Sequence, residues 1–160
     1  MKLLQLSRED FKEKYKEEKI EKVVVGAVVC DDEGNVLLLR RASGEFMEGL
    51  VELPSGNVEL DDKDIGYALE REIKEETGLD MKSVKSFIGS FDYKSSSGKN
   101  TRQLNYLAST TDMNIKLSAE HDAFFLVPFN ELSKYNISAS TNDILRKAFA
   151  IIADPTIEDV

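Results

Sequence analysis

The segment REIKEETGL, residues 71–79, places three glutamates within five positions. Glu72 and Glu76 lie one helical turn apart, where like charges repel each other by roughly 0.2–0.5 kcal/mol in an exposed helix. Residues 64–77 nevertheless have apolar side chains at helical spacing, and Gly78 is suited to the left-handed residue that ends a helix. Any fold of this chain must therefore accommodate a helix that carries concentrated negative charge.

The glutamates fall on the apolar face of this helix. With about 100° per residue and Ile65 set at 0°, Leu69 falls at about 40° and Ile73 at about 80°. Glu72 falls at about 340° and Glu76 at about 20°, so both carboxylates point toward the protein interior. A solvated acidic face, the ordinary explanation of such a segment, would point them outward. Buried carboxylates without a partner cost several kcal/mol or lose their charge, so we expect a compensating positive charge.

A divalent cation would supply that positive charge. Arg71 can reach Glu75 at i,i+4, but one arginine does not neutralise three acids. Clustered carboxylate oxygens are the ligands that Mg²⁺ and Mn²⁺ prefer. The upstream loop LPSGNVE contributes Glu59, and Gly56 permits a tight turn or a close approach of the backbone. The sequence therefore predicts a cation site where this loop meets the helix.

Length and composition indicate one domain, residues 1–160, with 41% hydrophobic and 32% charged residues. No apolar run reaches the roughly 18 residues of a membrane span, and the charged start lacks the apolar core of a secretory signal. We therefore expect a cytoplasmic protein that binds no membrane. A net charge of −9 disfavours nucleic acid as a partner. The single cysteine, Cys30, lies in the apolar run VVVGAVVC and is expected to be a buried structural thiol.

The remaining pattern mixes strands with helices. Residues 1–20 are expected to form an N-terminal helical extension, in which Ser7 caps a polar helix at SREDFKEKYKEEK. The segment KVVVGAVVCDDEGNVLLLRR predicts a hairpin of two strands around the turn DDEGN. A second strand pair flanks SSSGKN, a short strand ends before Pro128, and Thr141 or Asn142 caps an amphipathic helix at TNDILRKAFAIIA. This order indicates an α/β fold with a mixed sheet.

The segment GNVELDDKDIGYALEREIKEETGL, residues 56–79, resembles the Nudix box. That pattern reads Gly, five residues, Glu, seven residues, Arg-Glu, an aliphatic residue, any residue, Glu-Glu, any residue, Gly and an aliphatic residue. Its second half is matched in full by Arg71, Glu72, Ile73, Glu75, Glu76, Gly78 and Leu79. The first half has 14 residues between Gly56 and Arg71, one more than in the family. The acid of the pattern is then Asp62, with one extra residue after it. The alternative is that Lys63 takes the position of the acid; we favour Asp62.

The resemblance implies an αβα sandwich, with the mixed sheet between helices, and a hydrolase that uses Mg²⁺ or Mn²⁺ to cleave a nucleoside diphosphate linked to another group, X. The implied metal ligands are the Ser55 carbonyl and the carboxylates of Glu59, Glu72, Glu75 and Glu76. Glu75 and Glu76 would also act in catalysis, and Arg71 would orient the cluster. Relatives take the general base from the cluster or from a late loop, where SAEHDAFFLV offers Glu120. We prefer Glu120 to the adjacent His121, the only histidine, as a metal ligand or base.

Basic and aromatic side chains near the predicted loops are candidates for substrate binding. They are Arg40, Arg41, Phe46, Tyr93, Arg102 and His121. The arginines could bind phosphate through charge-assisted hydrogen bonds, and the rings could stack on a base. Each also has a simpler interpretation: surface charge for the arginines, packing for the rings, and local hydrogen bonding for the histidine.

The identity of X stays open, because the box does not specify it. Neither the proline past the box that suggests ADP-ribose in this family nor the later tyrosine of dinucleoside polyphosphate hydrolases is matched. The small size resembles MutT-like enzymes, so we expect a small-molecule nucleotide partner, a nucleoside triphosphate that is canonical or oxidised, with monophosphate and pyrophosphate as products. ADP-ribose, a nucleotide sugar or a dinucleoside polyphosphate is the near alternative.

Two interpretations come from other classes of protein. A non-catalytic nucleotide sensor on the same fold usually lacks helix glutamates, which this chain keeps. A diphosphate isomerase of related fold needs a reactive cysteine, for which the apolar surroundings of Cys30 are unsuited. A homodimer is common in the family and stays open as the oligomeric state.

Overall fold

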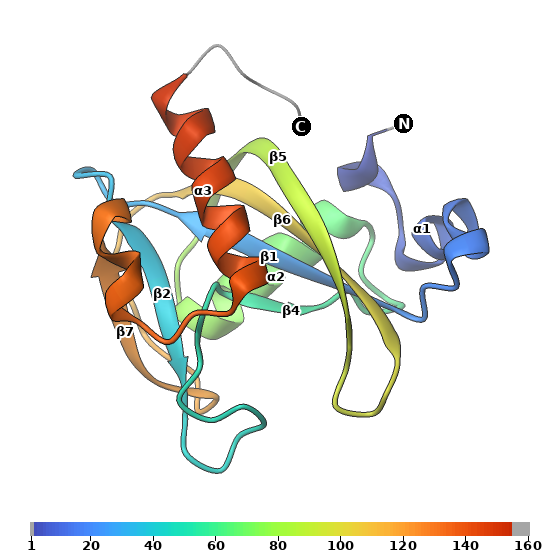
Figure 1. The fold of residues 1–160 in the computed structure, drawn as a ribbon. Coiled ribbons are helices and arrows are strands. Elements are labelled where there is room, and N and C mark those ends of the chain that lie inside the picture. Colours follow the sequence, from blue (N-terminus) through green and yellow to red (C-terminus); the bar gives the residue numbers. More distant parts are fainter. Residues whose placement is uncertain (1, 155–160) are drawn as a thin grey trace.

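Strands cross the middle of the molecule, with helices on both sides, in the computed structural model, which describes residues 2–154 (Figure 1). The helices are α1 (Arg8–Lys14), α2 (Ile65–Thr77) and α3 (Ala139–Ala153), with 3₁₀ helices at Leu3–Gln5, Lys16–Glu18 and Phe129–Lys134. The strands are β1 (Lys22–Val29), β2 (Val36–Arg41), β3 (Val51–Glu52), β4 (Ser55–Asn57), β5 (Met81–Lys94), β6 (Asn100–Thr110) and β7 (His121–Val127). Within the described residues, none of the helices combines the length and the apolar character that a bilayer span requires.

The strands form two sheets. In the four-stranded sheet, ordered β4-β1-β6-β5, β1 is parallel to β6 and antiparallel to β4. The three-stranded sheet, ordered β3-β2-β7, is antiparallel. The second predicted strand pair is confirmed, because β5 and β6 are antiparallel neighbours on either side of the SSSGKN turn.

The predicted hairpin of β1 and β2 is wrong, although its turn forms. Asp31 Oδ1 accepts hydrogen bonds from the backbone N–H groups of Glu33 and Asn35, both at 2.9 Å, which is typical of an Asx turn. Beyond a single bridge between Cys30 and Val36, the two strands separate. Both edges of β1 are already paired, with β4 and β6, so β2 pairs with β3 and β7 instead.

Helices cover both faces of the four-stranded sheet. Val25 of β1 packs with Leu69 of α2 in one buried cluster. Val28 of the same strand faces the opposite side of the sheet and packs with Ile144 of α3 in a second buried cluster. The predicted sandwich, a mixed sheet between helices, is confirmed. Because α2 lies against β1, the direction of its side chains relative to the core is fixed.

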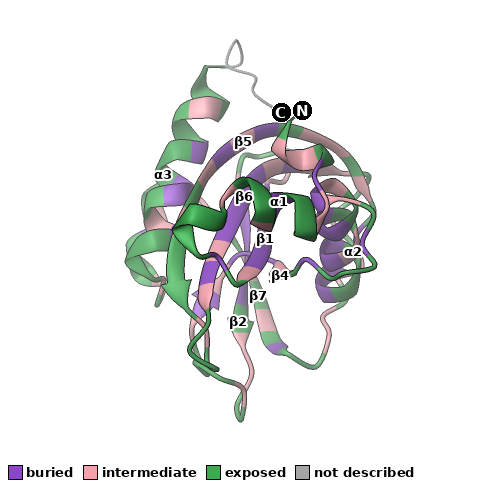
Figure 2. Cartoon of the chain, turned by 90° about the vertical axis from the view of Figure 1, so that its right-hand side faces the viewer, coloured by how far each residue is buried: buried purple, intermediate pink, exposed green. Residues whose placement is uncertain are grey.

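The N-terminal segment packs on the core through one face of α1. Ser7 accepts a hydrogen bond from the backbone N–H three residues later at 3.1 Å, so the predicted cap is confirmed. Phe11 is fully buried, while much of the outer surface of α1 is exposed (Figure 2). The helix ends at Lys14, earlier than predicted, and Tyr15 beyond it packs against Phe11 and under the Arg102 guanidinium, 4.7 and 5.4 Å from its ring centre.

The C-terminal helix begins at Ala139, earlier than its sequence pattern predicts. The predicted caps, Thr141 and Asn142, are wrong, because Ser138 is the capping residue. Its Oγ accepts a hydrogen bond from the Thr141 N–H at 3.2 Å. Ser138 has the extended backbone of a cap, with φ −64° and ψ 154°, whereas Thr141 already lies in the first turn and is buried.

Candidate active site

Helix α2 carries the glutamates in the predicted orientation. Asp64 caps its N-terminus by accepting a backbone hydrogen bond at 2.8 Å, and Gly78 ends it with φ 74°. Glu72 and Glu76 are only 9% and 5% exposed, so their inward direction is confirmed. Glu75 lies at the border of the apolar stripe, and its side chain is 57% exposed. Of these three carboxylates, two thus enter the protein and one faces water.

Strand β4 holds both inward carboxylates from the side. The Ser55 N–H donates a hydrogen bond to Glu76 Oε1 at 2.8 Å. At Gly56, a β-carbon would lie 2.0 Å from the Cδ of Glu72, so the carboxylate occupies the space that a side chain would fill. The close backbone approach predicted for Gly56 therefore exists, and Glu72 is the group that it admits.

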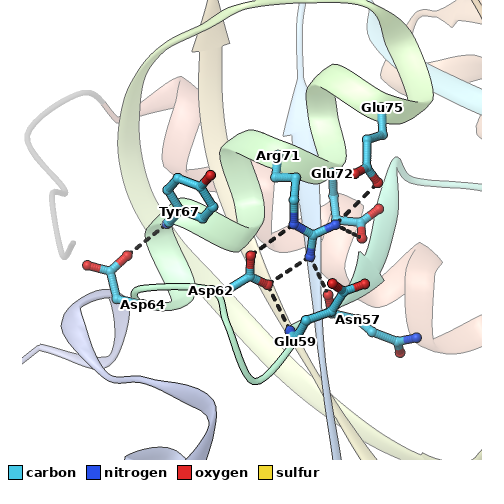
Figure 3. A network of polar contacts seen from close by, with 8 residues as sticks. All are labelled: Asn57, Glu59, Asp62, Asp64, Tyr67, Arg71, Glu72 and Glu75. Atoms are coloured by element: carbon cyan, nitrogen blue, oxygen red, sulfur yellow. Dashed lines mark hydrogen bonds and ion pairs between the residues drawn. The ribbon is translucent and has the colours of Figure 1, made fainter.

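Arg71 organises the carboxylates on another side of the cluster (Figure 3). Its Nε and Nη2 donate to the two oxygens of Asp62 at 2.9 and 2.8 Å, which is a bidentate pair. Nη1 donates to Glu72 at 2.9 Å and to Glu75 at 3.2 Å. Nη2 also donates to the Asn57 carbonyl at 2.9 Å. These five bonds match the five N–H groups of a guanidinium, so the orientation of Arg71 is fixed.

Asp62, and not Lys63, lies at the acidic position between loop and helix. Its side chain is only 3% exposed, and the hydrogen bonds from Arg71 lower its pKa. Asp62 Oδ2 also accepts the Glu59 N–H at 2.7 Å, which closes the loop. Glu59 itself has an exposed side chain, drawn beside the Arg71 guanidinium in Figure 3.

Burial disfavours the ionised forms of two carboxylates, Glu72 and Glu76. It raises the pKa of Glu72 to about 7, an effect that Arg71 opposes and that the charges of Glu75 and Glu120 increase. Burial raises the pKa of Glu76 to about 9, and Glu72 and Glu120 add to the shift. Buried carboxylates that favour a bound proton also fit a divalent cation, which neutralises them and takes oxygen ligands.

Residues at the start of β7 reach the same cluster. Glu76, Glu120 and His121 each offer one ligand atom, and these atoms lie within 4.8 Å of one another. Glu120 is exposed and His121 is buried. The fold thus places both candidates of the SAEHDAFFLV segment beside the carboxylates of α2.

Glu52 of β3 belongs to this neighbourhood and was missed by the sequence analysis. Its Oε2 lies 2.9 Å from His121 Nε2 and accepts a hydrogen bond from Arg41 Nη1, also at 2.9 Å. The only local signal was its place just before the box, in ELPSG. Its partners come from β2 and β7, and the pairing of those strands is a tertiary feature that the local pattern does not contain.

Arg41 and His121, two of the candidate substrate-binding residues, contact Glu52, and Phe46 is bonded to Arg41. Arg41 is bound to Glu52, and its Nε also donates to the Phe46 carbonyl. Phe46 is 61% exposed, in the loop between β2 and β3. Burial raises the pKa of Tyr93, and the Glu52 carboxylate adds to this shift.

The other two arginines are occupied by carboxylates. Arg40 Nε pairs with Asp122 at 2.8 Å, and both side chains are exposed. Arg102 pairs with Asp92 and Glu18, each at 2.7 Å, and so links β6 to the N-terminal segment. The structure does not bring Arg102 to the carboxylate cluster.

Cys30 is half-buried, where the sequence analysis expected a buried thiol. Burial, with a smaller contribution from Asp31, raises its pKa to about 11. The side chain is therefore a neutral thiol and not a reactive thiolate, which counts against the isomerase alternative.

Comparison with known proteins gives a family and a fold. The NUDIX domain model matches residues 21–148. The structure of a MutT protein from Methanosarcina mazei Go1 is 25% identical, with a TM-score of 0.73, and the alignment covers 86% of this chain and 98% of that chain. No curated protein matches the sequence.

Two further structures share the fold. The Caenorhabditis elegans Ap4A hydrolase, as a binary complex, is 23% identical with a TM-score of 0.70, over 82% of this chain and 98% of that one. The NUDIX domain of Shewanella oneidensis NrtR, complexed with ADP ribose, is 17% identical with a TM-score of 0.70, over 92% of this chain and 99% of that one.

Proposed function

Because this chain belongs to the NUDIX family and is a Nudix pyrophosphohydrolase, we propose that it hydrolyses a nucleoside triphosphate, canonical or oxidised, to a monophosphate and pyrophosphate with Mg²⁺ or Mn²⁺. The similarity to a MutT protein supports this choice of substrate. ADP-ribose, nucleotide sugars and dinucleoside polyphosphates are the alternatives for the same reaction.

The observation that carries the proposal is the pair of buried carboxylates on α2. Glu72 and Glu76 are held in the interior by the β4 backbone and by Arg71, and no second arginine or lysine is bonded to them among the described residues. A structural role alone would be served better by apolar side chains, because buried charges without compensation destabilise a fold. A cation-binding role accounts for both their position and their charge.

The ligands that we assign to the cation are the carboxylates of Glu72, Glu75 and Glu76, with the Ser55 carbonyl and Glu59 at the edge. A bound Mg²⁺ or Mn²⁺ screens the charge of the diphosphate and lowers the pKa of a bound water. Arg71 fixes the direction of Glu72 and Glu75 through its hydrogen bonds, so it acts on the reaction by positioning them.

The proton of the attacking water must be accepted by a carboxylate at the site. We take Glu75 and Glu120 as the candidates for this base, since both are exposed near the buried pair. In Glu75, a hydrogen bond from Arg71 holds one oxygen and leaves the other open to water.

The nucleoside is proposed to lie toward Arg41, Phe46 and Tyr93. Phe46 offers an exposed ring on a loop anchored by Arg41, and Tyr93 offers a second ring from β5. Such rings stack on any base, so they support nucleotide binding without specifying the base.

Phosphate and pyrophosphate release tests the proposal. The panel contains canonical and 8-oxo nucleoside triphosphates, ADP-ribose, a diadenosine polyphosphate and a nucleotide sugar, each with and without Mg²⁺. We expect metal-dependent release of pyrophosphate from a triphosphate, and a loss of about 10²-fold or more in Glu75→Gln. Glu70→Gln is the matched control, because Glu70 is an exposed glutamate on the opposite side of α2.

Two results would contradict the proposal in different ways. Preferred turnover of another panel member would keep the hydrolase and replace the substrate. Nucleotide binding without turnover of any panel member would replace the enzyme with a nucleotide sensor.

A further inference from the structure

The two ring nitrogens of His121 have different surroundings. Nε2 lies 2.9 Å from Glu52 Oε2. Nδ1 is buried and has no hydrogen-bond partner among residues 2–154. The whole side chain is inaccessible to solvent, with 0% exposure. A buried nitrogen without a hydrogen-bond partner is unfavourable, so a ligand for Nδ1 is expected.

The Glu52 carboxylate determines which nitrogen carries the proton. Glu52 Oε2 also accepts a hydrogen bond from Arg41 Nη1 at 2.9 Å, so this oxygen already serves as an acceptor. Nε2 must then donate to it. In the neutral ring, this leaves Nδ1 with a lone pair.

The His121 ring is close to two carboxylates. One ring nitrogen of His121 lies within 4.8 Å of an oxygen of Glu76 and of an oxygen of Glu120, and those two oxygens are within the same distance of each other. Because Nε2 is engaged by Glu52, Nδ1 is the nitrogen that remains for a ligand. A histidine that binds a metal through one nitrogen commonly donates the other N–H to a carboxylate, which is the relation of His121 to Glu52.

We propose that Glu76, Glu120 and His121 Nδ1 form a cation site with a nitrogen ligand, at the edge of the α2 carboxylate cluster, and that this site takes Zn²⁺ or Co²⁺ in preference to Mg²⁺. Imidazole nitrogen suits these transition metals, whereas Mg²⁺ selects oxygen. The inference extends the proposed function, since it shares Glu76 with the hydrolytic site. It assigns Glu120 to the metal and leaves Glu75 as the base.

Nitrogen NMR on the single histidine tests the site directly. The chain has one histidine, so with a cleavable tag removed every imidazole signal comes from His121. In chelator-treated protein labelled with ¹⁵N-histidine, we expect the Nε2-protonated tautomer. Stoichiometric Zn²⁺ should shift the Nδ1 resonance strongly and leave Nε2 protonated, while Mg²⁺ should leave Nδ1 where it is.

Calorimetry with variants measures the preference. His121→Gln should weaken Zn²⁺ binding by about tenfold or more and leave Mg²⁺ binding within about twofold. Glu120→Gln should also weaken Zn²⁺ binding. Asp122→Asn is the matched control, because it removes a neighbouring exposed carboxylate that pairs with Arg40 and not with the cluster; its Zn²⁺ affinity should equal that of the wild type.

The proposal is overturned if Zn²⁺ binds the wild-type chain without moving the Nδ1 resonance, or if His121→Gln binds Zn²⁺ as tightly as the wild type. His121 would then be a core residue held by Glu52 alone. The NMR measurement needs no variant to fold and no turnover, so it is independent of the hydrolase assay. A chain that is inactive on the whole panel but shows the Nδ1 shift would lose only the proposed hydrolysis.

Discussion

The β-carbon position of Gly56 lies 2.0 Å from the Cδ of Glu72, so the carboxylate fills the space above the glycine. Gly56→Ala must therefore displace Glu72, and a displacement of about 1 Å at a catalytic group can cost about 10²-fold in rate. We expect kcat to fall by about that factor and Mg²⁺ affinity to weaken, as measured by steady-state kinetics and calorimetry. Gly89→Ala is the control, because its β-carbon would meet Ile144 at an ordinary 3.4 Å. An unchanged kcat in Gly56→Ala would contradict the role assigned to Glu72.

Arg71→Ala should destabilise the fold as well as the site. The substitution leaves Asp62 buried, with 3% of its side chain exposed, and without its bidentate partner. Breaking such a pair costs about 3 kcal/mol in the free energy of unfolding, which urea denaturation would measure. Arg8→Ala removes an arginine whose partner Glu9 is half-exposed, and we expect less than about 1 kcal/mol. Equal losses in the two variants would show that the Arg71 network is only a surface feature.

Metal-free protein should lose stability as the pH rises from about 5 to about 9. The folded-state pKa values of Glu72 and Glu76 are about 7 and about 9, against 4.5 for an unperturbed glutamate. The folded state therefore holds protons that the unfolded state has released, and the stability that they give is present in full below pH 4.5 and lost as the pH passes 7 and 9. Urea denaturation at a series of pH values, with chelator present, would measure this loss.

Added Mg²⁺ should reduce the loss at high pH, because a cation then takes the place of the protons. Glu76→Gln, which carries no charge at any pH, should flatten the profile of the metal-free chain, and Glu70→Gln should leave it steep. Equal stability at pH 5 and pH 9 in chelator would show that the two carboxylates are compensated in the folded protein by other means.

Arg102→Gln should affect stability and not substrate binding. Arg102 links Asp92 and Glu18 and lies over the Tyr15 ring, so its loss detaches the N-terminal segment from β6. We expect a fall of a few degrees in Tm with an unchanged KM for the best substrate. The opposite pattern, a raised KM with an unchanged Tm, would restore Arg102 to the substrate-binding residues that the sequence suggested.

The local features of the site were predictable from sequence, because they depend on the period of one helix. Spacing alone directs Glu72 and Glu76 inward and Glu75 to the border, and the structure agrees. The reach of Arg71 to Glu75 is likewise an i,i+4 relation. The position of Asp62 followed from counting residues in the box.

The features that sequence missed depend on strand pairing. Glu52 becomes a neighbour of His121 only because β2 pairs with both β3 and β7. The same pairing explains the wrong hairpin: the turn at Asp31 has ordinary hairpin chemistry, but β1 is already paired on both edges. The capping error at Ser138 is of a different kind, since several consecutive polar residues could each begin that helix, and only the packing of Thr141 decides among them.

Because β1 and β2 separate, the residues of the site are divided between two sheets. Glu72 and Glu76 lie on α2, which shares one buried cluster with β1 of the four-stranded sheet and with Leu37 and Leu39 of β2, whereas Glu52 and His121 belong to the three-stranded sheet. Among residues 2–154, no shared ladder of backbone hydrogen bonds joins the two sheets. The distance between the carboxylates of α2 and the His121 imidazole therefore depends on how one sheet packs against the other. Substitutions in the interior that change how the two sheets pack are therefore expected to change this separation, although they lie far from any ligand atom and leave every catalytic side chain in place.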